Sequence, residues 1–110
     1  MNTGTATQWA TPNVRTIVIT LDRNGYPQVP EGDETVSISP TKSQQINWKS
    51  DEPFLIDFKG NSPFYEEQFN NAYPQSGLLR RTVVPNNSVF YKYSIIINGK
   101  ALDPRVGVDP

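Results

Sequence analysis

Proline and glycine interrupt this sequence so often that long helices have little room to form. The chain of 110 residues contains ten prolines and seven glycines. Proline removes a helix hydrogen bond, and glycine lowers helix stability. The stretches between them are short and rich in β-branched and aromatic residues, which favour strands. We therefore predict an all-β protein.

Alternation of apolar and polar residues locates the strands. In residues 54–59, Phe54, Ile56 and Phe58 share one face, which we expect to face the core. Residues 88–97 form the strongest predicted strand, and the Asn98-Gly99 pair that follows is typical of a type I′ hairpin turn. The predicted strands are residues 14–21, 34–39, 45–49, 54–59, 77–84, 88–97 and 100–102, with an edge strand at Val106 and Val108.

Short strands separated by turns favour a two-sheet antiparallel Greek-key sandwich over βαβ units. We predict a flexible N-terminal arm in residues 1–13 and a single β-sandwich domain in residues 14–110. The long connection at residues 60–76 contains Ser62-Pro63, a pair typical of a helix start. One short helix is therefore expected in this connection.

This arrangement, with its long connection and closing hairpin, resembles the cupredoxin-like fold. Three sets of residues also resemble small bacterial proteins of unknown function, over roughly residues 34–110. They are Trp48-x-Ser50-Asp51-x-Pro53-Phe54-x-Ile56-x-Phe58, Ser62-Pro63-Phe64, and Tyr91-Lys92-Tyr93-Ser94 with Leu102-Asp103-Pro104. An immunoglobulin-like sandwich is the alternative, with Trp48 as its buried core tryptophan.

The sequence contains neither cysteine nor histidine, and its single methionine is Met1. Copper-binding cupredoxins use two histidines, a cysteine and a methionine as ligands. The resemblance therefore implies a fold without a copper site, and we expect no metal and no cofactor. Mechanisms that pair serine or cysteine with histidine are excluded as well.

Carboxylates are the remaining catalytic groups. Asp57 facing Glu66 or Glu67 would suit a carboxylate-dependent hydrolase, although nothing in the sequence demands that arrangement. Asp22 and Asp33 lie in turn-rich segments, where turn formation is the favoured role over calcium binding. We therefore predict no catalytic residue and expect that the protein is not an enzyme.

A formal net charge of −1 gives no basis for binding nucleic acid or an anionic membrane. No apolar run approaches the length of a membrane-spanning helix, and the start of the chain lacks a signal-peptide pattern. We expect a cytoplasmic protein. Secretion is the alternative if a leader peptide has been removed from the chain.

Aromatic residues in the predicted arm and loops are the best binding candidates. Our main hypothesis is a protein-interaction or assembly module, which would bind another protein through these aromatic residues or through an open sheet edge. The partner could also be a second copy of the chain, which would give a homodimer. The alternative is a carbohydrate-binding module that uses Tyr65, Tyr73 and nearby amides (Gln68, Asn70, Asn71 and Gln75). The ordinary role of such rings is to cover the core under long loops. The candidate surface comprises Trp9, Tyr26, Phe64, Tyr65, Phe69 and Tyr73.

Overall fold

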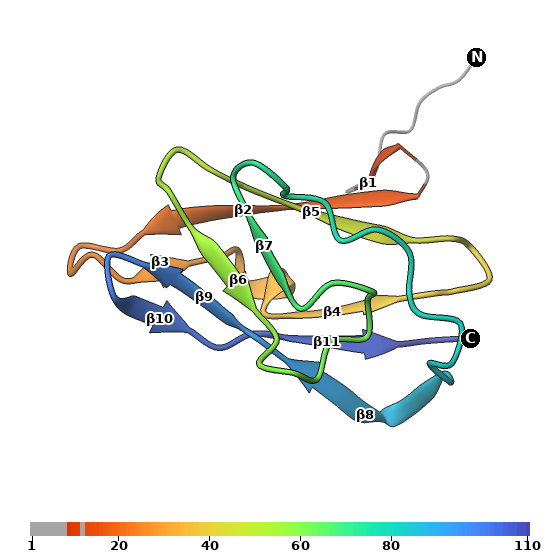
Figure 1. Ribbon diagram of the computed structural model, residues 1–110. Coiled ribbons are helices and arrows are strands. Elements are labelled where there is room, and N and C mark those ends of the chain that lie inside the picture. The colour runs from red at the N-terminus through yellow and green to blue at the C-terminus, as the bar shows by residue number, and fades with distance from the viewer. Residues whose placement is uncertain (1–8, 12) are drawn as a thin grey trace, which may run out of the picture.

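The structure, a computed structural model, describes residues 9–11 and 13–110 and is all-β, as predicted (Figure 1). Within this part of the chain the only helical element is a single 3-10 turn, η1 (Glu31–Asp33). The strands are β1 (Trp9–Thr11), β2 (Val14–Leu21), β3 (Pro27–Gln28), β4 (Thr35–Ile38), β5 (Gln45–Ser50), β6 (Leu55–Asp57), β7 (Gln68–Asn70), β8 (Asn86–Lys92), β9 (Ser94–Ile97), β10 (Lys100–Leu102) and β11 (Arg105–Val108).

The strands of the described residues form three sheets rather than the expected two. In the first, β2 pairs with β1, β3 and β5, and the long strands β2 and β5 run along the top of Figure 1. The second has the order β10-β9-β6-β7, and the third has the order β4-β11-β8. The second and third sheets share one long hairpin, because β8 leads into β9 and β10 leads into β11.

Two strand pairs are parallel, which corrects the expectation of purely antiparallel sheets. β2 pairs with β5 over Val14–Ile19, and β4 pairs with β11 over its full length. Parallel neighbours need a long crossover connection, and here residues 22–44 and 39–104 supply it. The alternation within each strand predicts its buried face but carries no information on the direction of its neighbour.

The core lies between the sheets and is centred on five packed aromatic rings. Trp48 stacks on Phe69 with ring centroids 5.2 Å apart and meets Tyr93 edge-on at 5.6 Å. Phe58 lies 4.8 Å from Tyr93 and 5.8 Å from Phe64. Aliphatic side chains surround these rings: Ile17, Ile19, Val36, Ile38, Ile46, Ile56, Leu79, Ile95, Ile97, Val106 and Val108.

The helix expected after Ser62-Pro63 does not form. The Ser62 hydroxyl accepts a hydrogen bond from the Phe64 N–H at 3.0 Å, and the Glu67 carboxylate accepts one from the Ser62 N–H at 3.1 Å. Such local side-chain bonds to the backbone compete with helix formation. The segment instead bends, so that both Phe64 and Phe69 point into the core.

The strand predicted at residues 77–84 is also absent, since only Leu79 makes a bridge there, to Phe64. The Arg80 guanidinium donates two hydrogen bonds to the Ser62 carbonyl, at 3.1 and 2.7 Å. The Val83 N–H donates to the Arg80 carbonyl at 3.1 Å and closes a turn. This segment is therefore anchored to the preceding loop instead of pairing as a strand.

The predicted strand at residues 88–97 is real but broken. It begins earlier, at Asn86, and Tyr93 separates β8 from β9. The Tyr93 N–H donates to the Pro104 carbonyl at 3.0 Å. The step from β8 to β9 therefore lies beside the step from β10 to β11, where the hairpin passes between the third and second sheets. β11 was expected at an edge but lies at the centre of its sheet, between β4 and β8.

Part of the predicted N-terminal arm belongs to the sandwich. The backbone of β1 pairs with the start of β2, with Thr11 opposite Val14. Residues 1–8 and 12 lie outside the described residues, as do the side chains of β1.

Candidate functional site

The six candidate aromatic residues separate into buried and exposed groups. Phe64 and Phe69 are only 0% and 3% exposed and belong to the core, so they are not available to a ligand. Tyr26, Tyr65 and Tyr73 are 47%, 63% and 75% exposed. The side chain of Trp9 lies outside the described residues.

Tyr65 and Tyr73 line one groove of about 520 Å³, which we call the tyrosine groove. A volume of a few hundred Å³ is typical of small-ligand sites. Tyr26 lies elsewhere, in the turn before β3, where the Lys100 ammonium sits 5.4 Å from its ring centre. The other residues of the groove are Glu66, Gln68, Phe69, Asn70, Gln75, Ser76 and Gly77.

A rigid turn after β7 presents Tyr73. The backbones of Asn70 and Tyr73 exchange hydrogen bonds of 3.2 and 3.1 Å. The Asn70 side-chain oxygen accepts from the N–H groups of Ala72 and Tyr73, and Asn71 ties the turn to Phe54 and Glu52. Asn71 is therefore a structural residue and does not line the groove with the other amides.

The opposite wall of the groove is held against β5. The Ser76 N–H donates to the Ile46 carbonyl at 2.7 Å, and the Ser76 hydroxyl accepts from the Ile46 N–H at 2.9 Å. Within the described chain, the side chains of Glu66 and Gln68 make no hydrogen bond or ion pair. The groove thus combines two exposed rings, fixed walls and unused polar groups.

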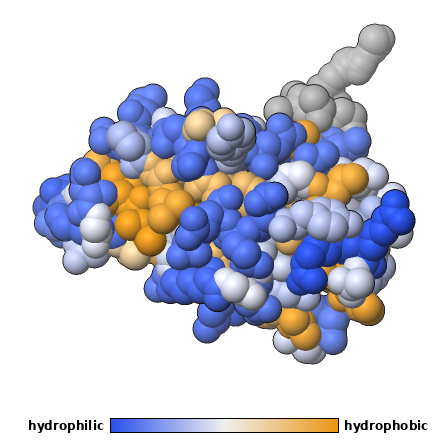
Figure 2. All heavy atoms as spheres, viewed as in Figure 1, coloured by the Kyte–Doolittle hydropathy of each residue, from blue (hydrophilic) through white to orange (hydrophobic). Residues whose placement is uncertain are grey.

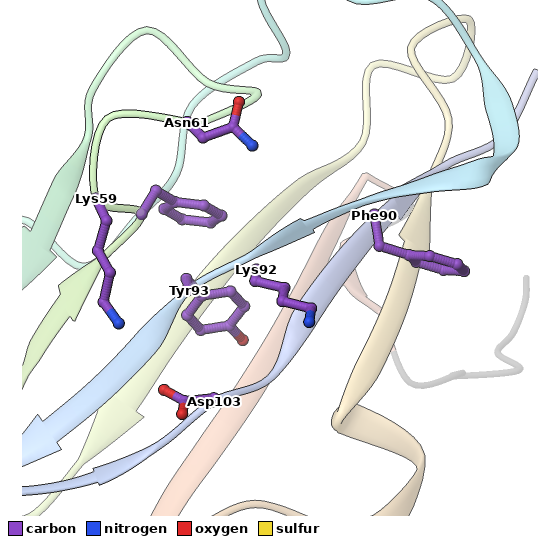
Figure 3. A pocket seen from close by; sticks show the side chains of 7 residues that line it. Lys59, Asn61, Phe90, Lys92, Tyr93 and Asp103 are labelled. Carbon is purple, nitrogen blue, oxygen red and sulfur yellow. The ribbon is translucent and has the colours of Figure 1, made fainter.

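A second hollow, of about 500 Å³, lies where β8 gives way to β9, and we call it the edge cleft (Figure 3). It exists because β6 pairs with β9 only as far as Asp57 opposite Ser94. Beyond that point Lys59 and Gly60 adopt positive φ angles of 56° and 86°, which turn the chain away from β8. The cleft is lined by Phe58, Lys59, Asn61, Phe90, Lys92, Tyr93 and Asp103.

The floor of the edge cleft is apolar and its rim is charged. Phe58 and Tyr93 are buried, whereas Lys59 and Lys92 are exposed. Figure 3 shows the two lysines on either side of the Tyr93 ring. The Asp103 carboxylate accepts a hydrogen bond from the Ser94 hydroxyl at 2.7 Å. Sequence reasoning missed this cleft, since it depends on the divergence of two strands.

Burial raises the pKa of the Tyr93 phenol well above its ordinary value. The hydrogen bond that its oxygen accepts from the Trp48 indole N–H, at 3.2 Å, lowers that pKa by a smaller amount, and the charge of Asp33 raises it. The phenol is therefore neutral at physiological pH.

Four of the carboxylates that sequence reasoning considered for chemistry have local roles, and Glu66 is the exception. Asp57 accepts from the Lys59 N–H, and Glu67 accepts from the Ser62 N–H. Asp22 accepts from two N–H groups of its own turn, and Asp33 pairs with Arg15. Among residues 9–11 and 13–110, no group of three or more acidic side chains is placed to hold a metal ion.

These features define a small β-sandwich, and among its surface hollows one is aromatic and rich in amides and another is basic. Comparisons with protein-family models, curated proteins and solved structures find no match for this chain. Within the described ranges there is no helix with the length and apolar character needed to cross a membrane.

Proposed function

We propose that this protein is a non-catalytic carbohydrate-binding domain and that the tyrosine groove is its binding site. The observation that carries the proposal is that Tyr65 and Tyr73, the two most exposed of the candidate aromatic side chains that the structure describes, line the same groove as Gln68, Asn70 and Gln75. Aromatic faces stack on the apolar faces of sugar rings. Amide groups both donate and accept hydrogen bonds, as sugar hydroxyls require.

The same contacts favour a sugar over a protein partner at this groove. A protein interface is centred on desolvated apolar anchors, and the two phenylalanines that would have supplied them are in the core. Exposed tyrosines beside amide side chains, of which Gln68 makes no hydrogen bond within the described residues, instead suit a ligand with alternating apolar and hydroxyl surfaces. Glu66 is the only acidic residue among those that line the groove, so the site lacks the carboxylate pair of a glycosidase.

A glycan array followed by calorimetry on the best hit tests the proposal. We expect Tyr73→Ala and Tyr65→Ala each to weaken binding by about 0.5–1.5 kcal/mol, the typical contribution of one aromatic contact. Tyr26→Ala is the matched control, because it removes an exposed tyrosine outside the groove. An array without signal, or equal losses in all three variants, would contradict the proposal.

We also propose that the sandwich is cupredoxin-like rather than immunoglobulin-like. Immunoglobulin domains are built from antiparallel sheets, so the parallel pairs β2–β5 and β4–β11 argue against that alternative. Nuclear Overhauser contacts between the backbones of Ile17 and Trp48, which lie opposite each other in the parallel pair, test this arrangement.

A further inference from the structure

We propose that the edge cleft binds an extended acidic peptide segment of a partner protein, which adds a strand beside β8. This interaction uses a different surface from the tyrosine groove. It is therefore independent of the carbohydrate proposal.

The first argument is the open edge of β8. Among the described residues, β8 pairs with β11 on one side, and no backbone hydrogen bond reaches it from the other. β9, the continuation of β8, has β6 on that side. The cleft is therefore the position that β6 would occupy if it continued past Phe58. Exposed strand edges of this kind recruit extended peptides through main-chain hydrogen bonds.

Only the last part of β8 is suited to such pairing. Phe90 lies opposite Gly107, but the next pair joins Asn86 to Val108, so residues 87–89 form a bulge. Bulges disrupt strand addition at sheet edges. Phe90 itself is held in place, because the Arg105 guanidinium lies 4.2 Å above its ring centre. The regular open edge is therefore limited to residues 90–92, beside the cleft.

The side chains of the cleft specify the chemistry of the peptide. Phe58 and Tyr93 are buried, while their neighbours Lys59 and Lys92 point to solvent. An added strand alternates its side chains in the same way, so one set faces the cleft floor above the two buried rings and the other meets the two lysines. Neither lysine pairs with a carboxylate within the described residues, where Arg15–Asp33 is the one ion pair. Asp103, the acidic residue among those that line the cleft, accepts a hydrogen bond from Ser94, and the two lysines give the rim a net positive charge that acidic residues of a peptide complement.

Titration with the capped peptide acetyl-Glu-Val-Glu-Val-Glu-amide, followed by NMR of the isotope-labelled full chain, tests the proposal. We expect shifts at the amides of residues 90–92 and slower hydrogen exchange there. We expect at least about tenfold weaker binding for the peptide with lysine in place of glutamate, since like charges then meet. The same peptide with every amide N-methylated keeps its side chains but cannot donate main-chain hydrogen bonds, so we expect it not to bind.

Variants of the protein separate charge complementarity from folding defects. Lys59→Glu and Lys92→Glu should each weaken binding of the peptide by about tenfold at low salt, because a favourable charge becomes a repulsive one. Lys49→Glu is the matched control, because Lys49 is an exposed strand lysine outside the cleft. Unchanged amide shifts at residues 90–92 with millimolar peptide would overturn the proposal. Equal binding of the N-methylated peptide would show that only an anion site is present and would overturn strand addition.

Discussion

Tyr93, the residue between β8 and β9, links the aromatic core to the edge cleft. Its ring packs on Trp48 and Phe58, and its hydroxyl accepts a hydrogen bond from the indole of Trp48 at 3.2 Å. Its backbone lies between β8 and β9, and its side chain forms part of the floor of the edge cleft. We therefore expect a change of this residue to alter the stability of the fold and, on the strand-addition proposal, the binding of the peptide.

Alkaline pH should destabilise the fold through Tyr93. Its pKa is raised in the folded state, so the stability it contributes is complete below the ordinary tyrosine pKa and falls as pH rises above it. The unfolded state then loses the proton first, at about pH 10, and the free energy of unfolding should decline by up to about 1.4 kcal/mol per pH unit. Urea unfolding at a series of pH values measures this slope.

The Tyr93→Phe variant is the control for this effect. It should lose about 1 kcal/mol at neutral pH, because the Trp48 N–H is left without its partner. Its stability should then decline less steeply above pH 10 than that of the parent protein. Identical alkaline slopes in the two proteins would contradict the assignment to Tyr93.

For single residues, the alternation of apolar and polar residues in the sequence predicts burial well inside strands and poorly in loops. Phe54, Ile56 and Phe58 all face the core, as their spacing indicates. Phe64 and Phe69 are aromatic residues of the same predicted connection as Tyr65 and Tyr73, and no periodicity in the sequence separates the two pairs. Phe64 lies in a bend held by hydrogen bonds of Ser62 and Glu67, and Phe69 lies opposite Ile56 in the pair of β7 with β6, and neither contact is encoded in a hydrophobic pattern.

Among the elements, the hairpin between β9 and β10 follows most directly from sequence. Asn98 and Gly99 have φ angles of 52° and 79°, as a type I′ turn requires. The pairing of Ile97 with Lys100 directly beside the turn then sets the register of β9 against β10.

Substitution of Gly99 by alanine should destabilise the protein by about 1–2 kcal/mol, the cost of a left-handed conformation for a residue with a Cβ. Gly32→Ala is the matched control. A Cβ at either position meets nothing within 4 Å, but only Gly99 has a positive φ. Thermal unfolding of both variants checks the difference, and equal stabilities would contradict a backbone origin.

Pairing between distant elements could not be predicted in the same way. The alternation in residues 105–108 indicates a strand, but its place between β4 and β8 depends on neighbours about seventy and fifteen residues away in sequence. The failure of residues 77–84 to form a strand has a similar cause, because Arg80 finds its partner in the Ser62 carbonyl. Both outcomes are set by tertiary contacts that override local propensity.

For the molecule as a whole, β11 holds the third sheet together. It pairs with β4 on one side and β8 on the other, and it contributes Val106 and Val108 to the core. The sequence contains no cysteine, so no disulfide compensates for the loss of these contacts.

Truncation after Pro104 should therefore unfold the protein, because burying two valines contributes about 3–6 kcal/mol and total stabilities are about 5–15 kcal/mol. Circular dichroism and dispersion of NMR signals measure the outcome. Removal of residues 109–110 alone is the control, since it deletes only the hydrogen bonds to Ile38 and Ser39. A well-dispersed spectrum from the shorter chain would contradict a central role for β11.

The contact between Tyr93 and Trp48 also gives the protein a built-in optical reporter. The Trp48 indole that donates to the Tyr93 hydroxyl is buried, while the ring that carries this hydroxyl forms part of the cleft floor. We expect an occupant that presses on that ring to alter the surroundings of the Trp48 indole, so that the emission of Trp48 would report binding without an attached dye.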